Sequence, residues 1–338
     1  MTNDFTNLVD LTSERLGGAV LFANDDFFAP KENLVRQSAP VWAEGKYTER
    51  GKWMDGWESR RRRTPGFDWC LLRLGLAGRI RGVVVDTAFF SGNFPESCSL
   101  EACAAPPNAD AEQLTSDEMR WVEILPQSRL EGDSENPFAV TSGERFTHLR
   151  FKIYPDGGVA RLRVYGEVLP DWDAVNRAGG LVDLAAVENG GLVVATSDEF
   201  FGQRHNLIMP GRAADMSDGW ETKRRRGPGH DWCVIQLGAR GTLTRVEVDT
   251  AHFKGNFPES CSLEVCEAPA ERLAPGDSYA NFAGWRELLP RTPLQAHTRH
   301  FYEAELKEAG AATHARFRIY PDGGVSRLRL YGNLAEDA

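Results

Sequence analysis

The segment that begins at Asp249 carries the residue types of an acid–base site in one short stretch. Histidine exchanges protons near neutral pH, lysine can stabilise developing negative charge, and carboxylates accept or donate protons. We therefore interpret four residues here as candidate catalytic groups: Asp249, His252, Lys254 and Glu259. The structural alternatives are a histidine that makes only a surface hydrogen bond and an aspartate that bonds the backbone in a turn.

A second set of polar residues has the chemistry to hold an anionic substrate with amide groups. Arginine binds a carboxylate in a bidentate manner, whereas carboxylate and amide oxygens accept hydrogen bonds from N–H groups. An arginine run follows the motif DGWETK, and a further arginine opens the later segment RLRLYG. The candidate substrate-binding residues are Glu221, Arg224, Arg226, Asn256 and Arg327. The alternatives are a solvated arginine face and a Glu221 that pairs with the nearby arginines.

Both sets belong to blocks that occur twice in the chain. DTAFFSGNFPESCSLEAC begins at Asp86 and returns at Asp249 as DTAHFKGNFPESCSLEVC, with three differences. DGWE with its arginine run and YPDGGVxRLRxYG are also duplicated, in the same order. A period of this length corresponds to a whole domain rather than to a solenoid repeat. The sequence therefore predicts two tandem copies of one fold.

The duplication supplies further candidates and a difference between the copies. The first-copy counterparts, also interpreted as substrate-binding, are Glu58, Asp86, Asn93 and Glu96. Phe89 and Ser91 stand where the second copy has His252 and Lys254. This difference indicates that the second copy is the chemically better equipped one, although the blocks alone do not assign the reaction to one copy or to a site between them.

The elements that must position these residues are short strands. Apolar and polar residues alternate in 148–154, 161–165, 315–320 and 327–331, which is the period of a half-buried strand. We expect the PDGGV segments between these strands to make tight reversals, and residues 127–146 to form a surface loop. Long amphipathic helices are hard to find. The pattern predicts an all-β fold, an antiparallel β-sandwich of jelly-roll type, in each copy.

The copies are expected at 17–166 and 190–332, with 167–189 as a linker and an insertion around 38–53 in the first copy alone.

The formal net charge of −10 argues against a nucleic-acid partner. No apolar run is long enough for a membrane span, and the first residues lack a signal-peptide pattern, so we expect a cytoplasmic protein. The six cysteines have no metal-binding spacing and are expected to be buried free thiols.

The duplicated blocks, from about Gly17 to Gly332, resemble the allantoicase family. The resemblance implies two tandem jelly-roll repeats similar to galactose-binding-like domains, and hydrolysis of allantoate to (S)-ureidoglycolate and urea in purine-nitrogen salvage. It also inclines us towards a homo-oligomer. We expect no cofactor and no metal, because the metal dependence associated with the family has no matching ligand motif here, although a divalent metal is not excluded. The alternatives are a non-catalytic small-ligand or carbohydrate-binding β-sandwich and a hydrolase of another ureido acid.

Overall fold

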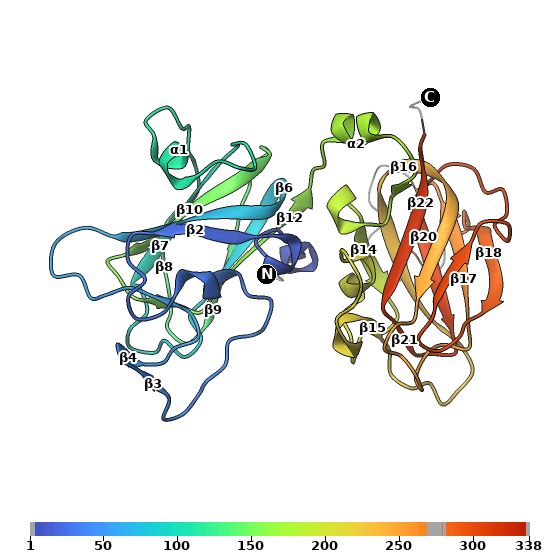
Figure 1. The fold of residues 1–338 in the computed structure, drawn as a ribbon, viewed down its shortest axis with the longest axis horizontal. Coiled ribbons are helices and arrows are strands. Elements are labelled where there is room, and N and C mark those ends of the chain that lie inside the picture. Colours follow the sequence, from blue (N-terminus) through green and yellow to red (C-terminus); the bar gives the residue numbers. More distant parts are fainter. Residues whose placement is uncertain (1–3, 269–278, 280–281, 336–338) are drawn as a thin grey trace. The chain divides into compact units, whose positions relative to one another are not determined.

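The computed structural model describes residues 4–268, 279 and 282–335, and the chain divides into two compact units, Met1–Leu169 and Pro170–Ala338 (Figure 1). Strands dominate both units, as the alternating sequence pattern predicts. Among the described residues, no helix has the length and apolar character to cross a bilayer.

The elements of the first unit are η1 (Asp4–Asn7), β1 (Val9–Asp10), η2 (Glu14–Leu16), β2 (Ala19–Ala23), η3 (Lys31–Val35), β3 (Tyr47–Thr48), β4 (Gly51–Lys52), β5 (Trp57–Glu58), β6 (Asp68–Asp86), β7 (Ser97–Cys103), α1 (Ala111–Thr115), β8 (Val122–Arg129), β9 (Glu135–Ala139), β10 (Phe146–Tyr154), β11 (Gly158–Val159) and β12 (Arg161–Val168).

The elements of the second unit are α2 (Trp172–Ala178), β13 (Val182–Asp183), η4 (Val187–Asn189), β14 (Leu192–Thr196), η5 (Arg204–Ile208), η6 (Met216–Asp218), β15 (Trp220–Glu221), β16 (Asp231–Asp249), β17 (Ser260–Cys266), β18 (Arg286–Pro293), β19 (Arg299–Tyr302), β20 (Ala312–Tyr320), β21 (Gly324–Val325) and β22 (Arg327–Leu334).

Each unit is an antiparallel sandwich whose two layers share one long strand. In the first unit, the first part of β6 lies in the layer β2-β6-β10-β7-β8, and its last part lies in the layer β1-β12-β6-β9. In the second unit, β16 joins β14-β16-β20-β17-β18 to β13-β22-β16-β19 in the same way. The all-β sandwich prediction is therefore confirmed.

The shared strand begins and ends at the same end of its sandwich. Asp231 pairs with Ile319 at the end of β20, and Asp249 pairs with Arg327 at the start of β22. Because a chain spans at most about 3.5 Å per residue, the segment between Ile319 and Arg327 can span less than half the extended length of β16, which keeps both aspartates at one end of the sandwich. The strand must therefore bend over the opposite end, where Gly238 and Gly241 approach other backbone too closely for a side chain.

The PDGGV segments cross from one layer to the other, so the prediction of a tight reversal between paired strands is wrong. β20 and β22 both pair with β16 and lie in different layers. Within the crossing, β21 pairs with β15, which brings the DGWE motif to it. Gly323 has φ of +133°, and a Cβ there would lie 2.6 Å from the Asn256 carbonyl oxygen. The glycine therefore lets the GNFP loop pack directly on the crossing segment.

The prediction of a loop over residues 127–146 is also wrong in part. The end of β8 and the whole of β9 lie within this range, and β9 pairs with the last part of β6. Pro137 lies opposite Val84 in this pair. Proline is tolerated in an edge strand because its missing N–H faces away from the sheet, so a segment without the usual strand composition still forms one.

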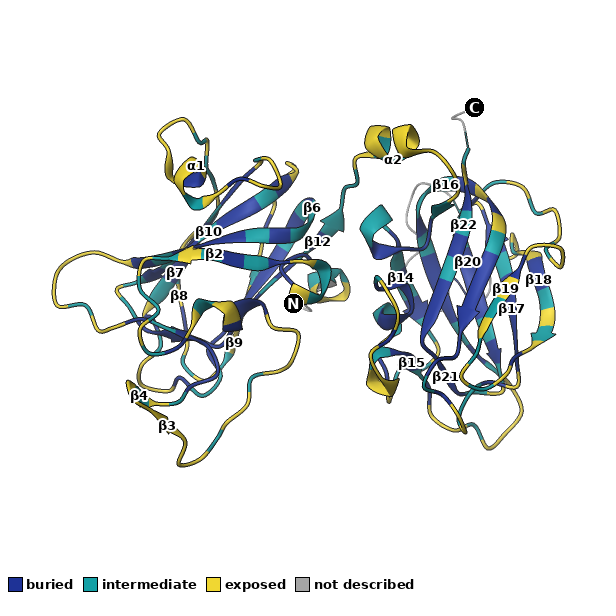
Figure 2. Cartoon of the chain, viewed as in Figure 1, coloured by how far each residue is buried: buried dark blue, intermediate teal, exposed yellow. Residues whose placement is uncertain are grey.

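The core of each unit lies between its layers, and the connecting loops carry most of the exposed residues (Figure 2). Trp57 and Trp220 of the DGWE motifs are fully buried, and each indole N–H donates 2.8 Å to a backbone carbonyl, of Asp25 and Asp198 respectively. All six cysteines are free and buried, and burial raises the pKa of the Cys98 and Cys261 thiols to about 12. The thiols are therefore packing groups rather than nucleophiles.

Candidate functional site

The duplicated motifs meet at the end of each unit where the long strand both begins and ends, which we call the loop end. In the second unit this region contains the DGWE motif, the start and finish of β16, the GNFPES loop and the PDGGV crossing. Segments far apart in the sequence come together because the bend in β16 returns the chain to its starting edge. The strand–loop framework thus positions most of the polar residues singled out from the sequence.

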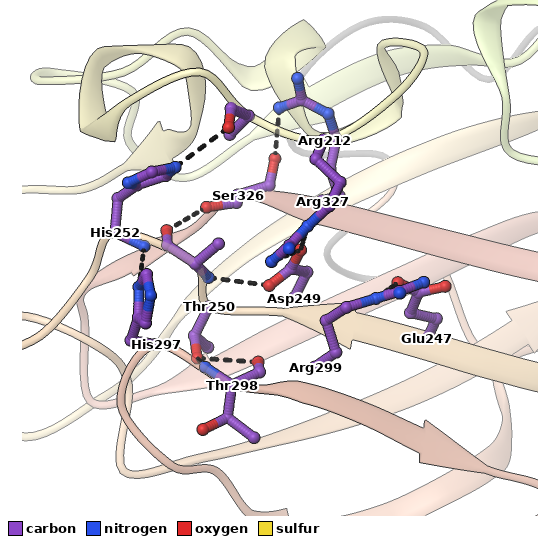
Figure 3. Close-up of polar contacts among 12 residues, drawn as sticks. Arg212, Glu247, Asp249, Thr250, His252, His297, Thr298, Arg299, Ser326 and Arg327 are labelled. Carbon is purple, nitrogen blue, oxygen red and sulfur yellow. Dashed lines mark hydrogen bonds and ion pairs between the residues drawn. The ribbon is translucent and has the colours of Figure 1, made fainter.

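Asp249 ends β16 in a turn and contacts an arginine that the sequence did not single out (Figure 3). One carboxylate oxygen accepts the Ala251 amide at 2.8 Å, as in the turn alternative. The other lies 3.4 Å from both Nε and Nη2 of Arg212. Asp249 is 1% exposed, whereas the Arg212 side chain is 62% exposed. Asp249 therefore anchors an arginine whose guanidinium also faces solvent.

His252 is held by both its backbone and its ring (Figure 3). Its φ is +69°, in the left-handed region, and its amide donates to Nδ1 of His297 at 2.7 Å. Its Nε2 lies 3.0 Å from the Ala213 carbonyl oxygen. A carbonyl can only accept, so Nε2 carries the proton. In the neutral ring, Nδ1 of His252 is then the nitrogen that can take up a proton.

Glu221 and Asn256 form a direct pair beside the same loop. The Asn256 amide donates to the Glu221 carboxylate at 2.5 Å, and its nitrogen also lies 3.8 Å from the Met216 sulfur. Residues 213–216 thus contact His252 on one side and Asn256 on the other. Lys254 lies exposed between these two residues in the sequence.

The three arginines of the run, Arg224 to Arg226, differ in their contacts and exposure. Arg225, the middle member, forms an ion pair with the buried Asp231, and its amide donates to Asp322 at 2.7 Å. It therefore ties the run to the start of β16 and to the PDGGV crossing. Arg224 and Arg226, the predicted substrate-binding members, lie exposed on either side of it.

The side chains of Arg327 and Glu259 are engaged by other protein groups, although Arg327 lies opposite Asp249 in the strand pair. Arg327 is 2% exposed, and its guanidinium donates to the carbonyls of Gly211, Asp218 and Ser326 and to the Asp218 carboxylate at 2.9 Å. A substrate cannot reach a group so enclosed, so its interpretation as substrate-binding is corrected to a structural one. Burial and the neighbouring Arg329 lower the pKa of Arg327 to about 10, which leaves it charged at neutral pH. Glu259 is exposed and pairs with Arg291 at 2.7 Å.

The first unit repeats the framework without the same chemistry. Asn93 donates to Glu58 at 2.7 Å, and Asp86 accepts the Ala88 amide at 2.8 Å. Burial raises the pKa of both carboxyl groups, Glu58 and Asp86. Glu96 is exposed, as its counterpart is. The first unit therefore keeps the Glu–Asn pair and the aspartate turn.

Around the first-unit turn, however, apolar side chains replace those of Arg212 and His252. Equivalent backbone contacts place Ala39 where the second unit has Arg212, because Arg161 bonds the Ser38 carbonyl as Arg327 bonds the Gly211 carbonyl. Phe89 has φ of +68°, like His252, and its ring lies 5.8 Å from that of Trp42. Two aromatic rings thus occupy the first-unit position that corresponds to the His252 site.

Two residues that the sequence reasoning missed, Arg212 and His297, lie where the copies have diverged. Arg212 precedes the point at which the first unit carries its extra hairpin, β3 and β4, so a simple alignment does not pair it with Ala39. His297 comes three residues before His300, whose Nδ1 lies 3.1 Å from the Val248 carbonyl oxygen. In residues 4–268, 279 and 282–335, no group of three or more His, Cys, Asp or Glu side chains is arranged to hold a metal ion.

Comparison with known proteins gives one consistent result. The family model described as the allantoicase repeat matches residues 9–169 and 182–335. A probable allantoicase from Photobacterium profundum is 49% identical, with 98% of both chains covered. An allantoicase from Dictyostelium discoideum is 48% identical over 97% of this chain and 87% of that protein. The crystal structure of allantoicase from Saccharomyces cerevisiae superposes with a TM-score of 0.81 at 37% identity, covering 98% of this chain and 96% of that one.

Proposed function

The chain belongs to the allantoicase family, and from this premise we propose that it hydrolyses allantoate at the loop end of its second unit. Allantoicase is a hydrolase of carbon–nitrogen bonds in linear amidines and converts allantoate and water to ureidoglycolate and urea. The substrate carries a carboxylate and two ureido groups on one carbon. The site must therefore hold an anion, accept hydrogen bonds from ureido N–H groups and move protons.

The first two requirements are met by groups that surround residues 213–216. Arg212 and Lys254 supply exposed positive charge for the substrate carboxylate, and a guanidinium can bind it in a bidentate manner. The Glu221–Asn256 pair offers acceptor oxygens for ureido N–H groups. Arg224 and Arg226, three and five residues after Glu221, add further exposed positive charge.

The third requirement is met by His252, whose Nδ1 can exchange a proton. As the C–N bond breaks, the leaving urea nitrogen takes up a proton, and the nitrogen of the second ureido group donates its electron pair to the central carbon. Water then adds to the resulting imine-like carbon and loses a proton to a base. An imidazolium whose Nδ1 gives its proton to the leaving nitrogen becomes a neutral ring, and when the same Nδ1 accepts the proton of the attacking water the ring returns to its starting state.

One observation supports the second unit above the first. Four differences between the copies fall around the aspartate turn: Ala39 for Arg212, Phe89 for His252, Ser91 for Lys254 and Asp133 for His297. In the second unit each of these positions carries a basic side chain. Differences gathered at one place in an otherwise shared framework favour a chemical specialisation of that place.

Urea release from allantoate tests this proposal directly. Purified protein is expected to liberate one urea per allantoate consumed, measured by a coupled urease assay. Tight binding of allantoate without urea would support a non-catalytic binding protein instead. Urea from ureidoglycolate alone would support a hydrolase of another ureido acid.

Replacing Glu221 with glutamine is expected to lower kcat/KM for allantoate by roughly 10- to 100-fold, because a hydrogen bond to a charged acceptor becomes a neutral one. The matched control is Glu58→Gln, since Glu58 pairs with Asn93 as Glu221 pairs with Asn256. We expect the control to change kcat/KM by less than threefold. A larger loss in Glu58→Gln than in Glu221→Gln would place the substrate in the first unit.

Location and assembly are further parts of the proposal. The six buried free thiols suit a reducing compartment, which supports a cytoplasmic enzyme. The adjacent rings of Phe200 and Phe201 are each 62% exposed, and extended exposed apolar patches mark surfaces where proteins meet. This supports the expected homo-oligomer, which light scattering of the purified protein measures.

A further inference from the structure

The loop that carries His252 is fixed to a second loop by a short network of hydrogen bonds (Figure 3). The Thr250 hydroxyl donates to the Gln295 carbonyl at 2.6 Å and accepts the Thr298 amide at 3.0 Å. The Thr250 amide donates to the Thr298 carbonyl at 3.0 Å. Residues 249–253 therefore take their position from residues 295–298.

The least favourable conformation in this network is at His252 itself. A residue other than glycine in the left-handed region is strained and persists only when its surroundings hold it there. Its amide donates to Nδ1 of His297 at 2.7 Å, and His297 is also left-handed, with φ of +50°. The imidazole of His297 is thus the acceptor that secures the strained residue.

In the first unit, a different side chain accepts the hydrogen bond from the amide of the left-handed residue. Phe89 has φ of +68°, and its amide donates to the Asp133 carboxylate at 2.6 Å. Asp133 has φ of +49°, matching His297. A carboxylate keeps its acceptor oxygens throughout the neutral range, whereas an imidazole that takes a second proton has no acceptor left.

We propose that His297 is a positioning residue for His252, and that protonation of its Nδ1 releases the His252 backbone. The inference rests on the proposed function, because it assigns His297 to the same reaction. When Nδ1 is unprotonated, it accepts the amide and His252 keeps both its left-handed conformation and its bond to the Ala213 carbonyl. When Nδ1 is protonated, two N–H groups face each other and the loop must rearrange.

The charged groups considered around His297 lie on its own segment and on the loop that carries His252. On its own side, Arg299 pairs with Glu247 at 2.7 Å. Facing it is the His252 ring, with centroids 5.7 Å apart, and the same loop as His252 carries Asp249, which pairs with Arg212.

The test compares two substitutions at position 297. His297→Leu removes the acceptor and is expected to lower kcat/KM by roughly 3- to 10-fold at neutral pH, the factor for one ordinary hydrogen bond. His297→Asp copies the first unit, and is expected to recover most of that loss and to extend activity to lower pH than in the wild type. A wild-type pH profile in both variants would overturn the inference.

A second measurement does not depend on turnover. Labelling histidine with ¹⁵N gives backbone amide signals from only seven residues, and the His252 signal is assigned by its absence from His252→Asn. We expect this signal to shift with pH in the wild type and to lose that dependence on the His297 titration in His297→Asp. An amide signal that ignores His297 in the folded protein overturns the inference. If the signal follows His297 while His252→Asn keeps full activity, the inference about the loop stands and the proposed role of His252 fails.

Discussion

Replacing His252 with asparagine is expected to lower kcat for urea release from allantoate by about 10²- to 10⁴-fold, the usual contribution of a general acid–base group. Asparagine tolerates the left-handed region, and its amide can still donate a hydrogen bond, so the loop is expected to survive. It does not exchange protons near neutral pH. The loss should therefore appear in kcat rather than only in KM, because proton transfer belongs to the transition state.

The first unit supplies the matched control for this experiment. Phe89 occupies the equivalent position with the same backbone conformation, so Phe89→Asn tests the effect of an asparagine in that turn without touching an imidazole. We expect its kcat to stay within about threefold of the wild type. If Phe89→Asn lost activity while His252→Asn kept it, the reaction would belong to the first unit.

Replacing Arg327 with methionine is expected to lower the free energy of unfolding of the second unit by about 3–5 kcal/mol, the usual cost of removing one member of a buried ion pair. The Asp218 carboxylate and the carbonyls of Gly211 and Asp218 would each lose the hydrogen bond from this guanidinium, although the Ala214 amide still donates to the carboxylate and Arg329 to the Gly211 carbonyl. Denaturation monitored by tryptophan fluorescence measures the change. Because the same guanidinium fixes residues 211–218, we also expect the affinity for allantoate to fall.

Arg161→Met should produce a loss of similar size in the first unit, since Arg161 is 1% exposed and bonds Asp55 and Ser38 in the same manner. This second variant separates stability from catalysis. We expect Arg161→Met to weaken the fold with a smaller effect on turnover below the unfolding transition. An Arg327→Met protein with the unfolding midpoint of the wild type would contradict the structural role given to this residue.

The framework of the loop end was predictable from the sequence because the motifs are duplicated. The repeated blocks singled out Glu221, Asn256 and the possible turns at Asp86 and Asp249, since identical polar loops in two copies stand out against a varied core, but they did not predict that Glu221 pairs with Asn256. Their meeting in space depends on the bend in β16, which follows from strand pairing rather than from local composition. Sequence alternation predicts the strands but not the layer that each strand joins. The prediction of a tight reversal at PDGGV is wrong for this reason, because the segment crosses between layers.

The arginines show why residue type alone did not assign roles. Arg327 and Arg224 have the same chemistry, yet one is enclosed at a strand start and the other is exposed. Burial of a charged group is set by the tertiary partners that it meets, in this case Asp218 and the Gly211 carbonyl. His297 was missed because its contact with the His252 amide joins loops whose sequences differ between the copies, so repetition gave no signal.

The shared strand has a consequence for how the chain tolerates change in length. Its two ends, Asp231 and Asp249, are both anchored at the loop end. The number of residues between them must therefore match the length of the path that the strand follows over the sandwich and back. A deletion or insertion of one residue would displace one of the two aspartates. It would also move the side chains of one layer to the opposite face of the sheet, so that core residues would face solvent. Deletions within β16 should therefore be far more harmful than deletions in the hairpin of β3 and β4, although both alter the chain by the same amount.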